Sequence, residues 1–129
     1  MYDIRRPLLI AVDFDGTIAD GEFPDIGPPL PGAFETMRDL AKAGHRLILH
    51  TCRTNSSPDG RNHLDEAVAY CAARGVQFRS VNANHEEDWY YPGVPNGPKP
   101  MADVYIDDKN LGGFPGWDTV RKLLLGGVR

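Results

Sequence analysis

The sequence predicts an α/β fold in which strands and helices alternate along the chain around a mostly parallel sheet. Three observations support this prediction: a continuous apolar run at residues 8–12, a helix-then-strand pattern that occurs twice over residues 33–81, and a short apolar run at residues 103–106 that ends in two aspartates. Strands that alternate with helices form crossover connections, which place helices on both faces of a parallel sheet. We therefore expect a three-layer fold.

The first half of the chain gives one strand, one helix and a second strand. Residues 8–12 form an unbroken apolar run, which is typical of a central strand buried on both faces. Residues 33–43 carry apolar side chains at helical spacing and end at Gly44, a common residue at helix C-termini. A second strand is predicted directly afterwards, over residues 45–50.

The second half repeats the pattern. Apolar residues at helical spacing over residues 64–71 end at Gly75, and a strand is predicted over residues 76–81. The last strand is predicted at residues 103–106, and a closing helix is marked by apolar residues over 117–124.

Two segments resist this regular interpretation. Residues 19–32 contain four prolines and three glycines, which exclude a long helix or a central strand and predict a turn-rich flap. Residues 82–98 form a long irregular connection, and connections of this length are usually functional or mobile. Both segments follow a strand end, where open α/β sheets carry their ligand sites.

Composition bounds the class of protein. The chain has 129 residues, of which 41% are hydrophobic and 25% charged, as expected for one domain over residues 1–129. A net charge of −4 argues against a sequence-independent grip on nucleic acid or on an anionic membrane. The apolar run near the N-terminus is too short for a signal peptide or a membrane span, so we expect a soluble cytoplasmic protein. Cys52 and Cys71 form no CxxC pair and are expected to be reduced thiols.

Four aspartates lie at the ends of two predicted strands. Asp13 and Asp15 follow the first strand within the stretch DFDGT (residues 13–17), and Asp107 and Asp108 follow the last strand. Because the carboxyl ends of parallel strands meet at one edge of a sheet, the two acidic pairs are expected to converge there. Because carboxylates held this close together repel one another, a bound cation is expected between them. Oxygen ligands without a histidine or cysteine cluster suit a hard ion, and we expect Mg²⁺.

Two further polar residues lie at predicted strand boundaries. Thr51 follows the second strand, and Lys99 precedes the last one. A hydroxyl and an ammonium beside a carboxylate group suit the tetrahedral dianion of a phosphate. A threonine at a strand end is often a turn former and a lysine in a loop is usually solvated, so the prediction depends on their order along the chain.

This order of motifs resembles the haloacid dehalogenase-like superfamily, whose four motifs lie at successive strand ends. The DFDGT stretch is similar to the first motif, residues 47–51 to the second, Lys99 to the third and residues 104–108 to the fourth. The resemblance covers nearly the whole chain. It implies a Rossmann-like sheet, a bound Mg²⁺ and an aspartyl-phosphate intermediate.

The resemblance also implies a role for each motif residue. Asp13 is expected to be the nucleophile, Asp15 the general acid and base, and Thr51 and Lys99 the phosphate-binding groups. Members that release halide typically lack the second aspartate of the first motif, so Asp15 favours phosphate chemistry. The expected metal ligands are the acids of the first and fourth motifs: Asp13, Asp15, Asp107 and Asp108. The choice between Asp107 and Asp108 as the direct ligand stays open.

Residues at and beside the motifs are expected to line the substrate site. They are Phe14, Thr51, Cys52, Arg53 and Lys99. For Arg53, a contact with substrate phosphate and a surface ion pair both stay open. Cys52 is expected to be a small packed residue near the phosphate loop rather than a nucleophile, because no base and orienting partner can be named beside it.

The spacing of the motifs leaves no room for a cap, the inserted domain that usually gives specificity in this superfamily. A predicted helix, a strand and an irregular segment already fill each stretch between motifs. Without a cap, the site is expected to be open. Local loops, a second subunit of a homo-oligomer or a macromolecular substrate are then expected to take the place of the cap. The lid candidates are residues 82–98 and residues 54–61. The aromatic residues 89–91 either stack on a substrate base or sugar, or pin the loop to the core or to another subunit.

The expected function is a Mg²⁺-dependent phosphomonoesterase, a cytoplasmic hydrolase acting on a small phosphorylated metabolite such as a sugar phosphate or a nucleotide. One alternative is a phosphatase of nucleic-acid ends, with Arg53, Arg61 and Lys99 guiding the terminal phosphate; the acidic net charge opposes it. Another is a receiver domain that carries a stable phosphoaspartate. Motif order opposes the receiver, which has its acidic pair at the first strand and its phosphorylated aspartate at a middle strand.

Overall fold

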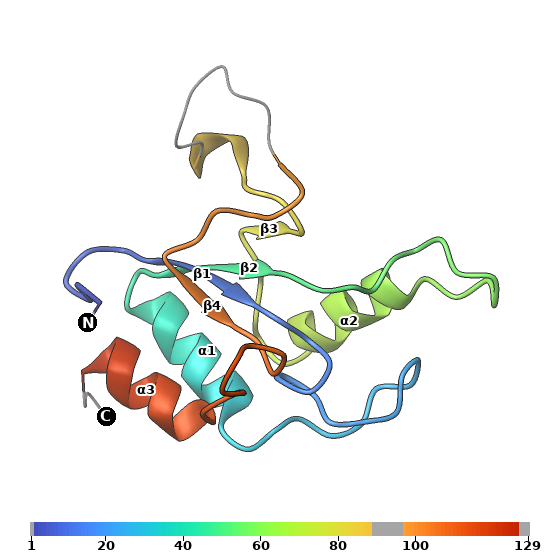
Figure 1. Cartoon of the computed structure of the whole chain (residues 1–129), viewed down its shortest axis with the longest axis horizontal. Helices are drawn as coiled ribbons and strands as arrows, with labels where there is room; N and C mark the ends of the chain where they lie inside the picture. Colours follow the sequence, from blue (N-terminus) through green and yellow to red (C-terminus); the bar gives the residue numbers. More distant parts are fainter. Residues whose placement is uncertain (1, 89–96, 127–129) are drawn as a thin grey trace.

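The structure, a computed structural model, describes residues 2–88 and 97–126 (Figure 1). Its centre is a parallel sheet with the strand order β3-β2-β1-β4. The strands are β1 (Leu9–Val12), β2 (Arg46–Leu49), β3 (Ser80–Val81) and β4 (Val104–Ile106). The helices are α1 (Ala33–Lys42), α2 (His63–Ala72) and α3 (Trp117–Leu125), with a single 3₁₀ turn, η1 (Glu86–Asp88). The predicted α/β class and parallel sheet are confirmed, and the described residues contain no cap domain.

The register of the sheet brings the carboxyl ends of the strands to one edge. Val12 of β1 pairs with Leu49 of β2 on one side and with Ile106 of β4 on the other. The ladder continues by one residue on each side of β1, because Asp13 N–H donates to the Ile106 carbonyl and His50 N–H donates to the Val12 carbonyl. The residues that follow β1, β2 and β4 therefore share this edge.

All three helices contribute to the core on one face of the sheet. Alternate strand residues, such as Ile10, Leu47 and Val104, are buried there against apolar side chains of α1, α2 and α3. α1 and α3 lie side by side on this face (Figure 1). Burying these apolar side chains supplies most of the stabilisation of such a fold, at roughly 25 cal/mol per Å² of apolar area.

The second face has a thinner cover than the expected layer of helices. Leu9, Ala11 and Ile48 pack there against Met101 and Tyr105, which belong to the connection before β4 and to β4 itself. Within the described residues this connection forms only the short turn η1, because it has no apolar stripe at helical spacing. None of the described helices has the length and apolar character needed to cross a bilayer.

The strand predicted over residues 76–81 is shorter than expected. Only Ser80 and Val81 pair with β2. Val76 is buried in the core, and its N–H closes the end of α2 by donating to the Cys71 carbonyl. Apolar character at Val76 therefore reflects the helix end rather than a strand.

The flap at residues 19–32 is turn-rich, as predicted, and it packs against α2. It folds back on itself through hydrogen bonds from Leu30 N–H to the Ile18 carbonyl and from Asp20 N–H to the Pro28 carbonyl. The Tyr70 hydroxyl of α2 donates to the Gly27 carbonyl at 2.9 Å. The flap is thus held beside the last turn of α2.

The described part of the 82–98 connection runs away from the carboxyl edge of the sheet. Asn82 lies at that edge, whereas Asp88 pairs with Arg46, the first residue of β2, at 2.6 Å and with Arg79 at 3.1 Å. The remainder of the predicted lid, including the aromatic residues 89–91, lies outside the described residues.

Candidate functional site

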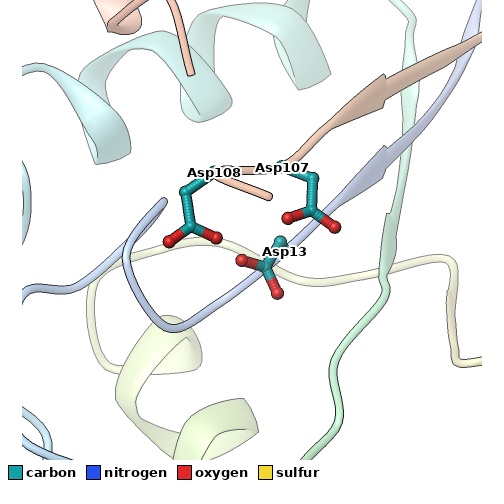
Figure 2. A group of neighbouring side chains, drawn as sticks. All are labelled: Asp13, Asp107 and Asp108. Atoms are coloured by element: carbon teal, nitrogen blue, oxygen red, sulfur yellow. The ribbon is translucent and has the colours of Figure 1, made fainter. Parts of the chain in front are cut away.

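Three carboxylates meet at the carboxyl edge of the sheet. Asp13 follows β1, and Asp107 and Asp108 follow the neighbouring strand β4. Each presents an oxygen, and these oxygens all lie within 4.8 Å of one another. Figure 2 shows the three side chains facing a common point. We call Asp13, Asp107 and Asp108 the acidic cluster.

Thr17 ties the two halves of the acidic cluster together. Its buried hydroxyl donates to Asp13 Oδ2 at 3.1 Å and accepts the Asp108 N–H at 3.0 Å. The Thr17 carbonyl accepts the indole N–H of Trp117 at 2.7 Å, which fixes the turn to the start of α3. No site role for Thr17 follows from the sequence analysis, although its place at the end of the DFDGT stretch was the available signal.

Gly16 is required by both conformation and space. Its φ of +80° lies in the left-handed region, which side chains other than glycine rarely adopt. A Cβ at this position would also collide with the Asp108 carboxylate. The glycine of the DFDGT stretch thus lets the β1 and β4 ends approach each other.

The electrostatics of the acidic cluster favour neutralisation. Burial, followed by the negative charge of Asp107 and the contacts of Asp108, raises the pKa of Asp13 from 3.8 to about 7, and the Thr17 hydrogen bond opposes this rise only in part. A carboxylate in such surroundings gains a proton or a cation near neutral pH. Because the donors of the cluster are all oxygens, they fit a hard divalent ion such as Mg²⁺.

The side chain of Asp15, also predicted as a metal ligand, points elsewhere. Its two oxygens accept hydrogen bonds from Nε and Nη2 of Arg53, both at 2.8 Å. Asp15 is not among the carboxylates that meet in the acidic cluster of the described residues. The structure therefore groups three of the four predicted metal ligands and gives Asp15 a separate partner.

Thr51 lies two residues after the end of β2, and Asn82, which was not predicted as a site residue, holds it. Asn82 follows β3 and accepts the Thr51 N–H on its side-chain oxygen at 2.8 Å. The Thr51 hydroxyl accepts the Arg53 N–H at 3.1 Å. Asn82 has a φ of 55°, a strained value that asparagine tolerates better than most residues, and such values often occur at functional sites.

The two lysines near the site have different contacts. The Lys99 ammonium lies 4.6 Å from the centre of the Tyr105 ring, on the second face of the sheet. Within the described ranges it makes no ion pair with the acidic cluster. Lys109, which was not predicted, has its ammonium 3.9 Å from Asp108 Oδ2 and a largely exposed side chain.

The structure corrects one predicted substrate contact. Phe14 is fully buried, with 0% of its surface exposed, and its ring packs edge-on against Tyr70 at 5.8 Å. It points into the core because it continues the alternation of Ile10 and Val12, whose side chains face the helices. The prediction that Cys52 is packed is also wrong: it lies beside Thr51 as an exposed free thiol.

Comparison with known proteins gives a relative of known structure. No protein-family model and no curated protein matches the chain. A solved structure of a conserved protein from Bacteroides thetaiotaomicron is 37% identical in sequence, with a TM-score of 0.78. The match covers 96% of this chain and 94% of the other.

Proposed function

We propose that this chain, which belongs to the same protein family as the conserved Bacteroides thetaiotaomicron protein, is a Mg²⁺-dependent phosphomonoesterase with Asp13 as its nucleophile. The observation that carries the proposal is the acidic cluster, with a further carboxylate, Asp15, two residues after Asp13. This arrangement agrees with the resemblance of four motifs to the haloacid dehalogenase-like superfamily. A purely structural role would leave three mutually repelling carboxylates unexplained.

In the first step, a carboxylate oxygen of Asp13 attacks the phosphorus of the substrate. An oxygen–phosphorus bond to Asp13 forms as the bond from phosphorus to the leaving oxygen breaks, and Asp15 gives its proton to that leaving oxygen. The products are an alcohol and an acyl phosphate on Asp13. The covalent intermediate divides one difficult reaction into two steps, each with a lower free-energy barrier.

In the second step, a water molecule attacks the phosphorus of the acyl phosphate. Asp15, now a carboxylate, takes a proton from this water, and the bond between phosphorus and Asp13 breaks. Inorganic phosphate leaves, and both aspartates return to their starting forms. The two hydrogen bonds from Arg53 suit Asp15 in its carboxylate state, which is the form that this step needs.

Three positions of the chain would bind the phosphate and its counterion. The acidic cluster would hold Mg²⁺, which supplies charge neutralisation for the transferring phosphoryl group. Thr51 would donate its hydroxyl to a phosphate oxygen from the end of β2. Lys99 would turn its flexible side chain from the Tyr105 ring to the same phosphate.

The described residues carry no cap over the acidic cluster, so we propose small phosphorylated metabolites, such as sugar phosphates or nucleotides, as substrates. The flap and residues 54–61 would then form the walls of the site, and a second subunit is a further candidate for covering it. We place this activity in the cytoplasm.

The experiment is hydrolysis of p-nitrophenyl phosphate with Mg²⁺ and with EDTA. We expect phosphate release by the wild type with Mg²⁺, and no release with EDTA or by Asp13→Asn. Asp118→Asn, which changes an exposed aspartate of α3 outside the candidate site, is the matched control and should retain activity. Activity that survives EDTA or Asp13→Asn would contradict the proposal. A stable phosphoprotein without release of phosphate would favour the receiver-like alternative.

A further inference from the structure

Arg53 is the largest side chain of the described residues that is fully buried, with 1% of its side chain exposed. A buried guanidinium is costly unless each of its donors finds an acceptor. Arg53 follows Thr51 by two residues, in the loop between β2 and α2. Its contacts therefore show what the fold gains from burying a charge beside the candidate site.

All three guanidinium nitrogens of Arg53 have acceptors inside the protein. Nε and Nη2 donate to the two oxygens of Asp15, both at 2.8 Å. Nη1 donates to the Pro24 carbonyl of the flap at 3.1 Å and to the His63 carbonyl at the start of α2 at 3.5 Å. This arrangement opposes the interpretation that Arg53 binds substrate phosphate, because no nitrogen is left without a protein acceptor.

Two aromatic rings fix the guanidinium in place. Its central carbon lies 5.2 Å from the centre of the Phe14 ring and 4.9 Å from that of the Phe23 ring, distances typical of cation–π contacts. Phe14 belongs to the core and Phe23 to the flap. The orientation of Arg53 is thus set by the turn after β1, by the flap and by α2 together.

Asp15 differs from its partner in exposure. Its side chain is 40% exposed, although Arg53 is buried. For stability alone, a buried ion pair is often no better than apolar residues of similar volume. A buried guanidinium that presents a bidentate fork to an exposed carboxylate instead fixes the direction of that carboxylate.

We propose that Arg53 is the positioning residue for Asp15: its bidentate fork holds the Asp15 carboxylate in a fixed direction, as the base that takes a proton from water in the second step. This inference rests on the proposed phosphomonoesterase function. The flap helps to orient Arg53, because Phe23 and Pro24 contact its guanidinium directly. Substrate binding itself is not assigned to Arg53.

Arg53→Lys tests the inference, because lysine retains the charge but cannot donate a bidentate fork. We expect kcat to fall by about 10-fold to 100-fold, the scale of a misplaced catalytic group. KM should stay within about twofold, because ground-state binding is not affected. Phosphoenzyme should accumulate in acid-quenched samples, since the water-activating step is slowed.

Arg121→Lys is the matched control. Arg121 of α3 donates to Asp39 of α1 at 2.7 Å, and neither residue belongs to the candidate site. It therefore reports the effect of exchanging an acid-paired arginine for lysine away from Asp15. We expect kcat within about twofold of the wild type for this variant.

The double variant Arg53→Lys with Asp15→Asn separates positioning from general support of the fold. If Arg53 acts through Asp15, adding Arg53→Lys to Asp15→Asn lowers the rate of phosphoenzyme formation by no more than about twofold further. An additive loss would overturn the inference, as would a raised KM with unchanged kcat in Arg53→Lys. So would a folded Arg53→Lys protein with the kcat of the wild type.

A second variant keeps Arg53 and its hydrogen bonds and removes only one of its ring contacts. Phe23 is 59% exposed, so Phe23→Ala is expected to fold. Loss of its ring contact with Arg53 should slow phosphoenzyme breakdown by up to about fivefold, the equivalent of a single cation–π contact. Unchanged breakdown in both Phe23→Ala and Arg53→Lys would refute the inference. If the wild type released no phosphate with Mg²⁺, the proposed function itself would be wrong.

Discussion

Replacement of Asp13 by asparagine is expected to stabilise the protein at neutral and alkaline pH when no divalent cation is present. Asn at this position keeps the shape of the side chain and an oxygen that accepts the Thr17 hydroxyl, but it removes one of three converging charges. The prediction concerns folding rather than catalysis, so it tests the electrostatics of the acidic cluster independently of any substrate.

The magnitude follows from the raised pKa of Asp13. In the fold this pKa is about 7, against 3.8 as the ordinary value. Between these values the folded chain retains a proton that the unfolded chain has lost, so the free energy of unfolding falls as pH rises. At about 1.4 kcal/mol for each pKa unit, reduced by about half because solvent screens the partly buried Asp13, the wild type loses about 2 kcal/mol over this range. Asp13→Asn has no such loss.

The assay is urea denaturation of both proteins in EDTA at a series of pH values from about 4 to about 8. We expect the variant to gain on the wild type steadily as pH rises, with the gain complete just above pH 7. Added Mg²⁺ should stabilise the wild type more at pH 8 than at pH 5, and should stabilise Asp13→Asn less. Parallel pH profiles for the two proteins would mean that the fold does not raise the pKa of Asp13.

Three further changes test other parts of the account. Gly16→Ala should destabilise the protein by more than about 1 kcal/mol and weaken Mg²⁺ binding, because φ is +80° and the new Cβ meets Asp108; calorimetry with Mg²⁺ measures both effects. Asp88→Ala should cost about 1 to 3 kcal/mol in denaturant unfolding, because this carboxylate is 2% exposed and two partly exposed arginines would lose their hydrogen bonds to it; an unchanged midpoint would mean that the connection needs no anchor. Lys99→Ala should lower kcat/KM by about 10-fold to 100-fold if Lys99 reaches the phosphate, and Lys109→Ala should change it by less than about twofold; the reverse order would assign that role to Lys109.

The acidic cluster could be predicted because its signals are local. The apolar runs that become β1 and β4 each end directly at an aspartate, and a parallel sheet brings such ends to one edge. The meeting of Asp13 with Asp107 and Asp108 follows from these two facts alone. Side chains of a strand alternate between its two faces, which places Phe14 with Ile10 and Val12 in the core. The prediction of Phe14 as a substrate contact could therefore have been avoided from the sequence.

The partner of Asp15 could not be predicted in the same way. Asp15 and Arg53 are 38 residues apart, and their pairing depends on how the loop after β2 turns beneath the flap. Nothing in the composition of either segment signals a buried arginine. The hydrogen bond from Thr51 N–H to Asn82 likewise depends on the positive φ of Asn82, which the sequence allows but does not require.

The direction taken by the connection after β3 could not be predicted from the sequence either. Residues 82–88 look like the start of a lid because they follow a strand end and open a long irregular connection. Asp88 instead pairs with Arg46 and Arg79, and these ion pairs draw the segment toward the amino end of β2. Charge pairing between distant segments decides its direction, and no local pattern encodes that pairing.

The most direct test of the account is to locate the phosphoryl group on the protein during turnover. Asp15→Asn, mixed with p-nitrophenyl phosphate and Mg²⁺ and quenched in acid, is digested and its peptides are analysed by mass spectrometry. We expect one phosphorylated aspartate, Asp13, and no modification when EDTA replaces Mg²⁺. Phosphate on another residue, or hydrolysis by the wild type with no covalent phosphate in either protein, would contradict Asp13 as the nucleophile.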